Sequence, residues 1–404
     1  MYISHLSLLN FRNYEHLELD LKPGMVLFQG DNGQGKSNLL EAIYMLAVAK
    51  SPRASSDREL VKRQLVDEET YSRVAAIVER GIEHGGGPLK LQMDFSSTPI
   101  PTEDEDDNLG SIGGISVQKY IRINGVPRRA STLVGQLNAV MFSAEDLELV
   151  YGPPSVRRRY MDILISQLDQ NYLRALQRYQ RVITQRNSLL KAIREGRSAE
   201  GELAFWDEQL VSEGEYIIGQ RRACIQQLSE MAGPIQRGLS GNGESMEIIY
   251  QPNVSLGNGD DEGGIAESMH RSLLERRRRE LAQGVTVTGP HRDDLIMLLD
   301  GMDVGAYASR GQSRTVVLAM KLAEAGYLKE RRGQEPILLL DDVLSELDVR
   351  RREHVLDQAS QYQQSFLTTA EVDSIDAAHL SGMNRFAVKS GHAEPMGSTT
   401  DVID

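Results

Sequence analysis

The sequence predicts an α/β protein of two lobes, one built on a mixed β-sheet and the other mostly helical. Three observations lead to this expectation. Strand-like runs fill the first 150 residues, a helical pattern follows, and strand and helix patterns alternate again from residue 295. The chain has 404 residues, of which 40% are hydrophobic, enough for packed cores. We expect one lobe from 1–150 and 285–390, a helical lobe from 151–284, and a flexible tail from 390–404.

Composition excludes several classes of protein. Cys224 is the one cysteine, so an intrachain disulfide and a four-thiolate metal site are excluded. No stretch approaches the roughly 20 apolar residues of a membrane span, and the first residues lack the pattern of a signal peptide. We therefore expect a soluble, cytoplasmic protein. The formal net charge of −13 opposes indiscriminate nucleic-acid binding, but local basic patches remain compatible with it.

The elements of the first lobe follow from periodicity. Leu17, Leu19 and Leu21 alternate with polar residues, which is typical of a strand with one buried face. Four segments carry strand patterns before residue 150: 17–21, 25–28, 89–95 and 115–123. A helix is expected over 37–49. The acidic stretch 103–107 interrupts the strands, and we interpret it as a surface insertion rather than a metal site because nothing local orients its carboxylates.

The second lobe is marked by a change of pattern after Gly152-Pro153-Pro154. Helical patterns cover 155–193 and 203–231, with a short break between them. They could form an antiparallel pair, but neither keeps a heptad long enough for a coiled-coil arm. The α/β pattern then resumes with a strand at 295–299, a helix at 310–331, and strands at 337–340 and 365–367.

A glycine-rich loop lies between an apolar strand and a helix. It fits the pattern of Gly, four residues, Gly-Lys-Ser at every position, and consists of Gly30, Asp31, Asn32, Gly33, Gln34, Gly35, Lys36 and Ser37. Glycines let backbone amides cradle phosphates at a helix N-terminus, Lys36 would neutralise phosphate oxygens, and Ser37 would hold Mg²⁺. The alternative is a loop that only turns a strand into a helix. The complete pattern favours nucleotide binding.

An acidic strand end supplies the metal-holding group that such a loop needs. The apolar run 337–340 ends in Asp341 and Asp342. Asp341 would hold Mg²⁺ and Asp342 could act as the general base for an attacking water. A strand followed by a capped turn explains the same residues in isolation. Two further acids, Glu346 and Asp348, follow at the strand end, where ligands gather in open α/β sheets.

A third motif opens the helix expected at 310–331. It consists of Ser309, Arg310, Gly311 and Gln312. Ser309 is a plausible N-cap, which is the simpler interpretation. The alternative is a second phosphate contact at a helix start, which would most naturally come from another subunit because Lys36 already occupies one face of the γ-phosphate.

Together these motifs resemble those of the ATP-binding-cassette ATPases. The glycine-rich loop resembles their Walker A motif, the acidic strand end resembles their Walker B motif, and Ser309 to Gln312 resemble their signature motif. Ser345 to Asp348 resembles their D-loop. More narrowly, the chain resembles the RecF family of bacterial recombination mediators, which is related to SMC head domains. The supporting segments are 9–14, 142–147, 152–160, 288–294 and 340–348, within a resemblance that spans residues 1 to about 370. Ala144 stands where proline is more usual.

The resemblance implies a cassette ATPase head that dimerises head to tail around two ATP molecules with Mg²⁺. Such dimers bind DNA at gaps and single-strand/double-strand junctions without sequence specificity, act with RecR and through it RecO, and promote RecA loading in replication, recombinational repair and the SOS response. Hydrolysis is slow, DNA-stimulated, and releases the clamp. By position, the ATP contacts also include Arg12, Asn13, Ser345, Asp348 and Thr369, with Thr368 as the other candidate for sensing the γ-phosphate.

Basic residues offer a place for DNA. Arg157, Arg158 and Arg159 are adjacent and could contact phosphates, although a solvated helix face explains them equally well. His291 is interpreted as a positioning residue, because a lone histidine in a turn is more often structural.

Two other classes of protein also use a phosphate loop: transporter-type ATPase subunits and stand-alone small-molecule kinases. Against a transporter subunit, the helical segment of this chain shows no membrane-facing character. A small-molecule kinase would leave the signature and D-loop motifs unexplained.

Overall fold

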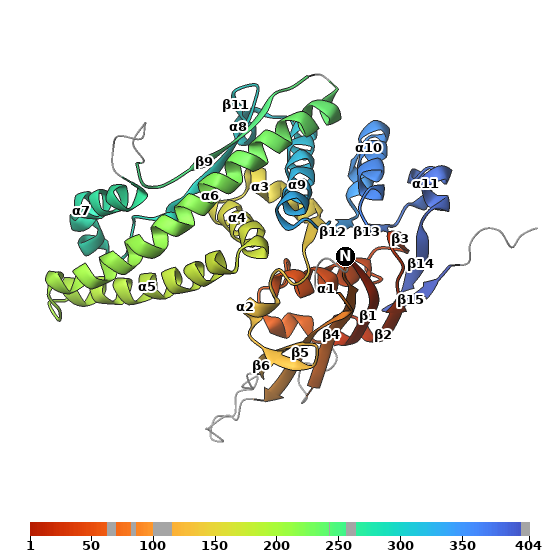
Figure 1. Cartoon of the computed structure of the whole chain (residues 1–404), viewed down its shortest axis with the longest axis horizontal. Helices are drawn as coiled ribbons and strands as arrows, with labels where there is room; N and C mark the ends of the chain where they lie inside the picture. The colour runs from red at the N-terminus through yellow and green to blue at the C-terminus, as the bar shows by residue number, and fades with distance from the viewer. Residues whose placement is uncertain (63–69, 82–85, 100–114, 242, 256–263, 397–404) are drawn as a thin grey trace, which may run out of the picture. The chain divides into compact units, whose positions relative to one another are not determined.

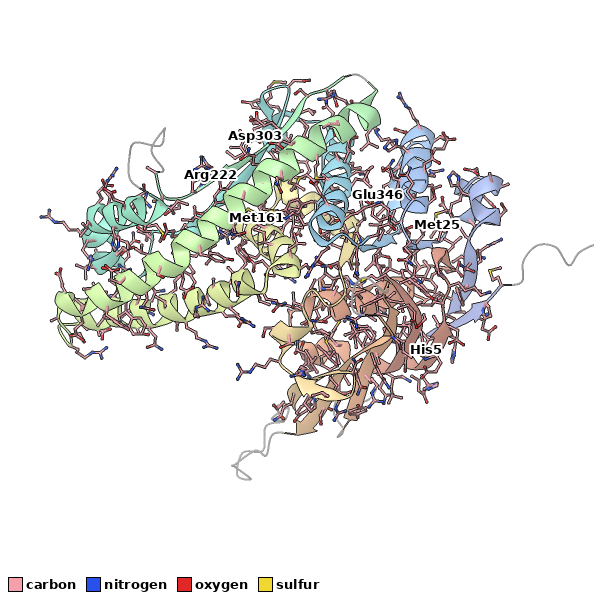
Figure 2. All side chains as sticks on the ribbon, in the orientation of Figure 1. His5, Met25, Met161, Arg222, Asp303 and Glu346 are labelled. Atoms are coloured by element: carbon pink, nitrogen blue, oxygen red, sulfur yellow. The ribbon has the colours of Figure 1, made fainter. Side chains whose placement is uncertain are left out.

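The computed structural model describes residues 1–62, 70–81, 86–99, 115–241, 243–255 and 264–396 (Figure 1). The chain divides into two units: Met1–Ala144 with Leu328–Asp404, and Glu145–Tyr327. Figure 2 shows their side chains, with Met25 of the first unit and Met161 of the second among those labelled. The acidic stretch expected as an insertion at 103–107 lies outside the described residues.

The division differs from the boundaries expected from sequence. Residues 285–327, expected in the first lobe, belong to the second unit. The cause is strand pairing: β10 (Asp294–Leu299) pairs with β9 (Met246–Gln251) along its whole length. Such pairing joins segments far apart in the chain, so local periodicity carries no sign of it.

One sheet of the first unit is antiparallel throughout, in the order β2-β1-β4-β5-β6-β7. Its strands are β1 (Tyr2–Phe11), β2 (Tyr14–Asp20), β4 (Thr70–Glu79), β5 (Leu89–Pro99), β6 (Ile115–Ile123) and β7 (Val126–Arg128). Leu6 and Leu8 of β1 are fully buried and Leu17 and Leu19 of β2 nearly so, which confirms the alternation read in β2.

The second sheet has the order β15-β14-β3-β13-β12-β8, and all its pairs are parallel except β14 with β15. Its strands are β3 (Gly24–Gln29), β8 (Ala139–Phe142), β12 (Ile337–Asp341), β13 (Gln364–Thr369), β14 (Asn384–Lys389) and β15 (His392–Pro395). The runs 25–28 and 337–340 are buried along their whole length, as expected for parallel strands covered on both faces.

Helix α1 (Lys36–Val48) packs against strands of both sheets, including β4 and β12. Nearly every residue of α1 is buried, which explains why its sequence is apolar around most of its circumference. The other helices of the unit are α2 (Ala130–Leu133), α10 (Val349–Ser360) and α11 (Ala377–Ser381). The loop between β3 and α1 connects two buried elements, so the packing of α1 fixes both ends of this loop.

The first residues of the tail expected over 390–404 belong to a hairpin. His392–Pro395 form β15, which pairs with β14 from Lys389↔His392 to Phe386↔Pro395. The Ser, Gly and Thr content suggested a frayed end, but Ser390-Gly391 is a tight hairpin turn. Residues 397–404 lie outside the described part of the chain.

The second unit combines helices with a three-stranded sheet in the order β11-β10-β9. The predicted helix 155–193 is two helices, because Asp169 ends α4 and caps α5 with a carboxylate that accepts from Asn171 N at 2.7 Å. The helices are α3 (Glu148–Tyr151), α4 (Pro154–Leu168), α5 (Gln170–Arg194), α6 (Leu203–Ser240), α7 (Ile265–Gln283) and α8 (Val304–Tyr307), with β11 at Met302–Asp303. Helix α9 (Arg310–Arg332) continues into the first unit.

Two fully buried arginines tie the second unit together. Arg186 of α5 donates to Asp207 of α6 at 2.8 Å and to Glu280 of α7 at 2.6 Å. Arg221 of α6 donates to Asp293 at 3.0 Å, just before β10. Buried charges need such partners because burial removes their hydration. Among the helices of the described residues, none is long and apolar enough to span a membrane.

Candidate phosphate-binding site

The loop between β3 and α1 has the backbone that phosphate binding requires. Gly30, Gly33 and Gly35 have φ angles of 154°, 79° and 119°, a region that disfavours other residues. A Cβ on Gly30 would lie 2.2 Å from Val388 O, and one on Gly35 would meet the side chains of Asn13 and Tyr14. Gly35 caps α1 without a side chain, and the first turn of α1 has no acidic residue. The helix start therefore retains its partial positive charge for an anion.

Lys36 is held inside the loop. Its ammonium donates to Gly30 O at 2.6 Å and to Asp31 O at 2.9 Å, and the residue is 6% exposed. Burial lowers the pKa of Lys36, against the charges of Asp342, Asp341 and Asp31, which raise it. The structure thus places the Lys36 ammonium against the carbonyls of the loop.

The carboxylate of Asp341 meets the loop at the end of β12. Ser37 Oγ donates to Asp341 Oδ1 at 2.7 Å, and Thr368 Oγ1 donates to the same oxygen at 2.8 Å. Strands β12 and β13 pair with Asp341 opposite Thr368, so the parallel register brings the threonine to this carboxylate. The motifs at 30–37 and 341–342, 304 residues apart, therefore form one site.

Asp342 has a strained backbone that its neighbours stabilise. Its φ is 53°, in the left-handed region. Its N–H donates to Thr368 Oγ1 at 2.9 Å, and its carbonyl accepts from Ser345 Oγ at 2.7 Å. Burial, with the charges of Asp341 and Glu346, raises the pKa of Asp342 against the lowering effect of Lys36. A carboxylate whose pKa is raised is a stronger base, which suits a general base.

The hydroxyl of Thr369, one of the two candidates for sensing the γ-phosphate, does not contact Asp341 or Asp342. Its Oγ1 donates to Glu371 O at 3.2 Å and accepts from Glu371 N at 3.0 Å. Its carbonyl accepts from Gly30 N at 3.4 Å, so its backbone does reach the loop. The hydroxyl beside Asp341 and Asp342 belongs instead to Thr368, and the alternation of side chains along β13 is the reason.

Asn13 contacts the loop directly. Its Nδ2 donates to Gln34 O at 2.8 Å, and its Oδ1 accepts from Asn38 at 2.9 Å. Tyr14 adds a hydrogen bond from its hydroxyl to Gly35 O at 3.0 Å. The turn between β1 and β2 therefore contacts the phosphate loop directly.

Arg12 is held by a buried carboxylate that the sequence analysis missed. Its Nε and Nη2 donate to Glu41 of α1 at 2.9 and 2.7 Å. Arg53 donates to the same carboxylate at 2.9 Å and to Ser37 O at 3.1 Å. Burial alone would raise the pKa of Glu41, but Arg12, Arg53 and Ser51 together hold it below its ordinary value. Glu41 lies one helical turn beyond Ser37, a spacing that indicates the shared face.

The D-loop residues have structural contacts in the first unit. Ser345 contacts Asp342, as described above. The carboxylate of Asp348 caps α10 by accepting from Arg351 N at 2.9 Å. Both residues are exposed, so they are accessible to a ligand or a second chain.

The signature residues open α9 in the second unit. Ser309 Oγ accepts from Gln312 N at 3.3 Å, and Gln312 Oε1 accepts from Ser309 N at 2.9 Å, a reciprocal capping box. The simpler interpretation of Ser309 as an N-cap is confirmed. Ser309, Arg310 and Gly311 are nevertheless exposed, while Gln312 also donates to Glu244 at 3.0 Å.

The three arginines proposed for DNA contact differ in their surroundings. Arg157 donates twice to Asp294, at 2.7 and 2.9 Å, and to Gly152 O at 2.8 Å. Arg158 donates to Asp293 O at 2.8 Å, and burial lowers its pKa. Arg159 is exposed. The guanidinium of Arg157 is engaged within the second unit, which argues against a DNA contact there.

His291 is a half-buried residue with structural contacts on both ring nitrogens. Its Nδ1 lies 2.8 Å from Tyr179 Oη and its Nε2 lies 3.0 Å from Thr286 O. Burial lowers the pKa of His291 to about 4. The neutral ring therefore links the turn before β10 to α5.

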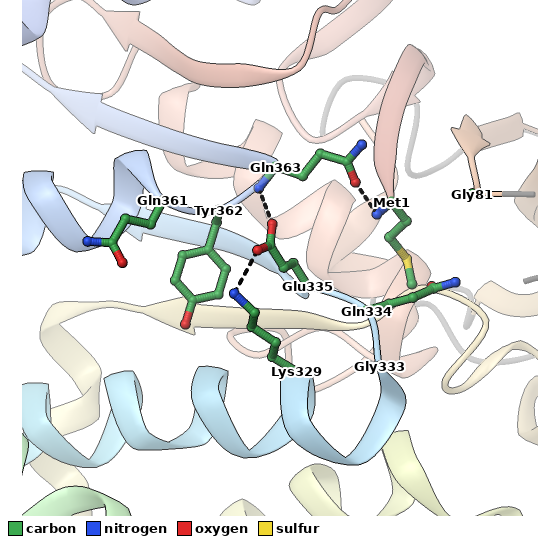
Figure 3. A pocket seen from close by; sticks show the side chains of 9 residues that line it. All are labelled: Met1, Gly81, Lys329, Gly333, Gln334, Glu335, Gln361, Tyr362 and Gln363. Atoms are coloured by element: carbon green, nitrogen blue, oxygen red, sulfur yellow. Dashed lines mark hydrogen bonds and ion pairs between the residues drawn. The ribbon is translucent and has the colours of Figure 1, made fainter. Parts of the chain in front are cut away.

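A cavity of about 630 Å³ lies elsewhere in the first unit (Figure 3). Its charged groups are paired: Glu335 accepts from Lys329 at 2.8 Å and from Gln363 N at 2.6 Å, and the amino group of Met1 donates to Gln363 Oε1. None of the residues that line it belongs to the phosphate loop or to the acidic strand end. We assign it no part in the site.

The donors around Asp341 fit a magnesium ion bound with a nucleotide. A serine hydroxyl and a carboxylate lie in contact beside a phosphate loop, and Mg²⁺ is usually held by one or two such ligands together with phosphates and water. In the described part of the chain, no cluster of three or more His, Cys, Asp or Glu side chains is arranged for a metal. The metal would therefore depend on the nucleotide for its remaining ligands.

Comparison with known proteins shows the family of this chain. Residues 2–390 match the family described as RecF/RecN/SMC N terminal domain. "DNA replication and repair protein RecF" of Chloroflexus aurantiacus is 44% identical, over 97% of this chain and 99% of that protein, and the protein of that name from Roseiflexus castenholzii is 41% identical over 98% and 100%.

Solved structures give the same result. One described as the recombination mediator protein RecF-ATP in the RecFOR pathway has a TM-score of 0.84 and 33% identity, covering 98% of each chain. An Smc head domain from Pyrococcus furiosus, with a TM-score of 0.54 and 17% identity over 98% of this chain and 96% of that one, shares the fold. The fold is thus the expected cassette ATPase head, and the chain belongs to the RecF family.

Proposed function

We propose that this chain is an ATP-dependent, DNA-binding recombination mediator in DNA replication and repair. The observation that carries the proposal is the assembled phosphate site, in which Ser37, Asp341 and Thr368 are joined by hydrogen bonds beside Lys36. The relatives named RecF and the RecF-ATP structure support ATP as the nucleotide.

The residues of the site would divide the work of ATP hydrolysis among them. Lys36 and the loop amides offset the charge of the β and γ phosphates, and Asp342 orients the attacking water and accepts its proton. Ser37 and Asp341 would hold Mg²⁺, which when bound neutralises charge that develops on the phosphates. Because these groups are positioned before the nucleotide arrives, little reorganisation is needed.

We further propose that two copies bind head to tail, with Ser309 to Gln312 of one copy closing the ATP site of the other. The start of α9 supports this, since Ser309, Arg310 and Gly311 are exposed at a helix N-terminus. ATP binding would then time a clamp on gapped or junction DNA, and slow, DNA-stimulated hydrolysis would release it. RecR, and through it RecO, would join this clamp to support RecA loading and the SOS response.

DNA contact would be electrostatic and independent of sequence. Arg159 is the exposed member of its arginine cluster, while Arg157 serves the fold. Binding by a few phosphate contacts weakens steeply as salt rises. Affinity for gapped duplex that stays constant between low and high salt would refute this part of the proposal.

The first test is specific ATPase activity as a function of protein concentration, with and without gapped duplex DNA. Activity that rises with concentration, and rises further with DNA, supports a site formed between two chains. A rate indifferent to both would favour a kinase-like enzyme that works as a single chain. Lys36→Ala should abolish ATP binding, whereas the exposed Lys90→Ala serves as the control and should bind ATP normally.

A second variant tests whether the signature of one copy contributes to the ATP site of the other. Ser309→Arg places a long cation at an exposed helix start, so it should leave ATP binding by the monomer intact but prevent ATP-driven dimerisation. Ser188→Arg, an exposed serine on α5, is the matched control. Normal dimers of the Ser309 variant in sedimentation experiments would remove the trans arrangement.

A further inference from the structure

The last hairpin of the described chain touches the phosphate loop. Strands β14 and β15 are joined by Ser390 and Gly391, whose φ angles of 48° and 79° form a two-residue turn closed by the pair Lys389↔His392. Gly391 N donates to Gln34 O at 3.1 Å, and Ser390 N donates to Gln34 Oε1 at 2.7 Å. Gln34 is thus held through both its backbone and its side chain.

The same carbonyl is held from the opposite end of the chain. Asn13 Nδ2 donates to Gln34 O at 2.8 Å, so both acceptor positions of this oxygen are used by two turns. The two turns also touch each other closely, since a Cβ on Gly391 would lie 2.3 Å from Asn13 O. Behind the loop, a Cβ on Gly30 would lie 2.2 Å from Val388 O of β14.

These contacts determine which way a loop amide points. A trans peptide is planar, and its carbonyl and the following N–H point in opposite directions. Holding Gln34 O against the two turns therefore directs the N–H of Gly35 away from them. Tyr14 holds the next carbonyl, that of Gly35, at 3.0 Å, so two consecutive peptide planes are fixed.

We infer that the Ser390-Gly391 turn is a positioning element for nucleotide binding, which presets the phosphate loop by holding Gln34. The inference deepens the proposed function and rests on it, because it concerns the same nucleotide site. It assigns a role to the terminal hairpin rather than to a residue that touches phosphate. Preorganised amides bind an anion more tightly because the loop need not be ordered during binding.

The chain offers a closely matched control. Asn124-Gly125, between β6 and β7, is a turn of the same conformation, with φ angles of 50° and 76°. A Cβ on Gly125 would meet nothing within 4 Å, and the turn is exposed. Gly391→Ala and Gly125→Ala therefore impose similar backbone strain, but only the first displaces a turn from the phosphate loop.

The experiment measures the affinity of the full-length protein for a fluorescent ATP analogue. We expect Gly391→Ala to weaken binding by tenfold or more relative to Gly125→Ala, which should match the wild type. In steady-state ATPase assays the change should appear in KM for ATP rather than in kcat. Equal affinities for the wild type and both variants would overturn the inference, whereas no binding by the wild type would overturn the proposed function itself.

A milder variant covers the case in which Gly391→Ala does not fold. Gln34→Met keeps the length of the side chain but removes the acceptor for Ser390 N–H, and it introduces no clash. We expect a smaller loss of affinity, about threefold, and equal losses for ATP and GTP because the hairpin acts on the loop that binds phosphates. Unchanged affinity in a folded Gln34→Met protein would overturn the inference.

Discussion

Replacing Thr368 by valine should separate the chemistry of the site from its stability. The substitution keeps the shape of a side chain that is 1% exposed but removes a hydroxyl with two partners. That hydroxyl donates to Asp341 Oδ1 at 2.8 Å and accepts from Asp342 N at 2.9 Å. Thr368→Val thus removes one of the two hydroxyl donors to the carboxylate expected to hold Mg²⁺, the other being Ser37. It also leaves the N–H of the strained Asp342 without its acceptor.

The magnitude follows from these two bonds. A hydrogen bond to a charged group contributes about 1.5–3 kcal/mol, and a tenfold change in binding corresponds to about 1.4 kcal/mol. If that energy orients Asp341, the Mg²⁺ concentration for half-maximal ATPase activity should rise by roughly 10- to 100-fold. Loss of the Asp342 contact should also lower kcat, because the general base is then held less firmly.

Thr369→Val is the matched control for this experiment. Thr369 is equally buried and also makes two hydrogen bonds, but both are to Glu371. Both variants should lose similar thermal stability, while only Thr368→Val should change the Mg²⁺ dependence in an ATPase titration. The reasoning is refuted if the two variants have the same Mg²⁺ dependence, or if Thr369→Val is the more impaired.

Two further predictions concern the second unit. Burial lowers the pKa of His291 to about 4 in the folded protein. Between about pH 6.5 and pH 4, this histidine is therefore protonated in the unfolded chain but neutral in the folded protein. The free energy of unfolding should therefore fall as pH drops from 6.5 towards 4, by about 2 kcal/mol at pH 5. His291→Gln should remove that part of the pH dependence in urea titrations, and an unchanged slope would contradict the assignment. Arg186→Met leaves the buried Glu280 without its cation and should cost about 3–5 kcal/mol in urea unfolding, whereas Arg178→Met, at a more exposed pair, should cost about 1 kcal/mol or less. Equal losses for the two arginine variants would show that burial of the first pair does not determine its importance.

The sequence alone identified the two motifs that form the candidate phosphate site in the first unit. The pattern at 30–37 requires glycines, a lysine and a serine at fixed spacing, because the backbone geometry and charges that cradle phosphate are local. The strand at 337–340 was predicted for a similar reason, since an apolar run of that length ending in acids is complete in itself. Both motifs could be read without knowing what lies beside them.

Tertiary structure decided which residues complete the site. Register between β12 and β13 selected Thr368 over Thr369, and α1 brought Glu41 to Arg12 and Arg53. Pairing of β10 with β9 places residues 285–327 in the second unit. Pairing of β15 with β14 brings Ser390 and Gly391, expected in a tail, into contact with Gln34. These results depend on contacts between segments up to 356 residues apart. Such contacts arise from strand pairing and burial in three dimensions, whereas the periodicity and spacing of a single sequence record only what neighbouring residues share.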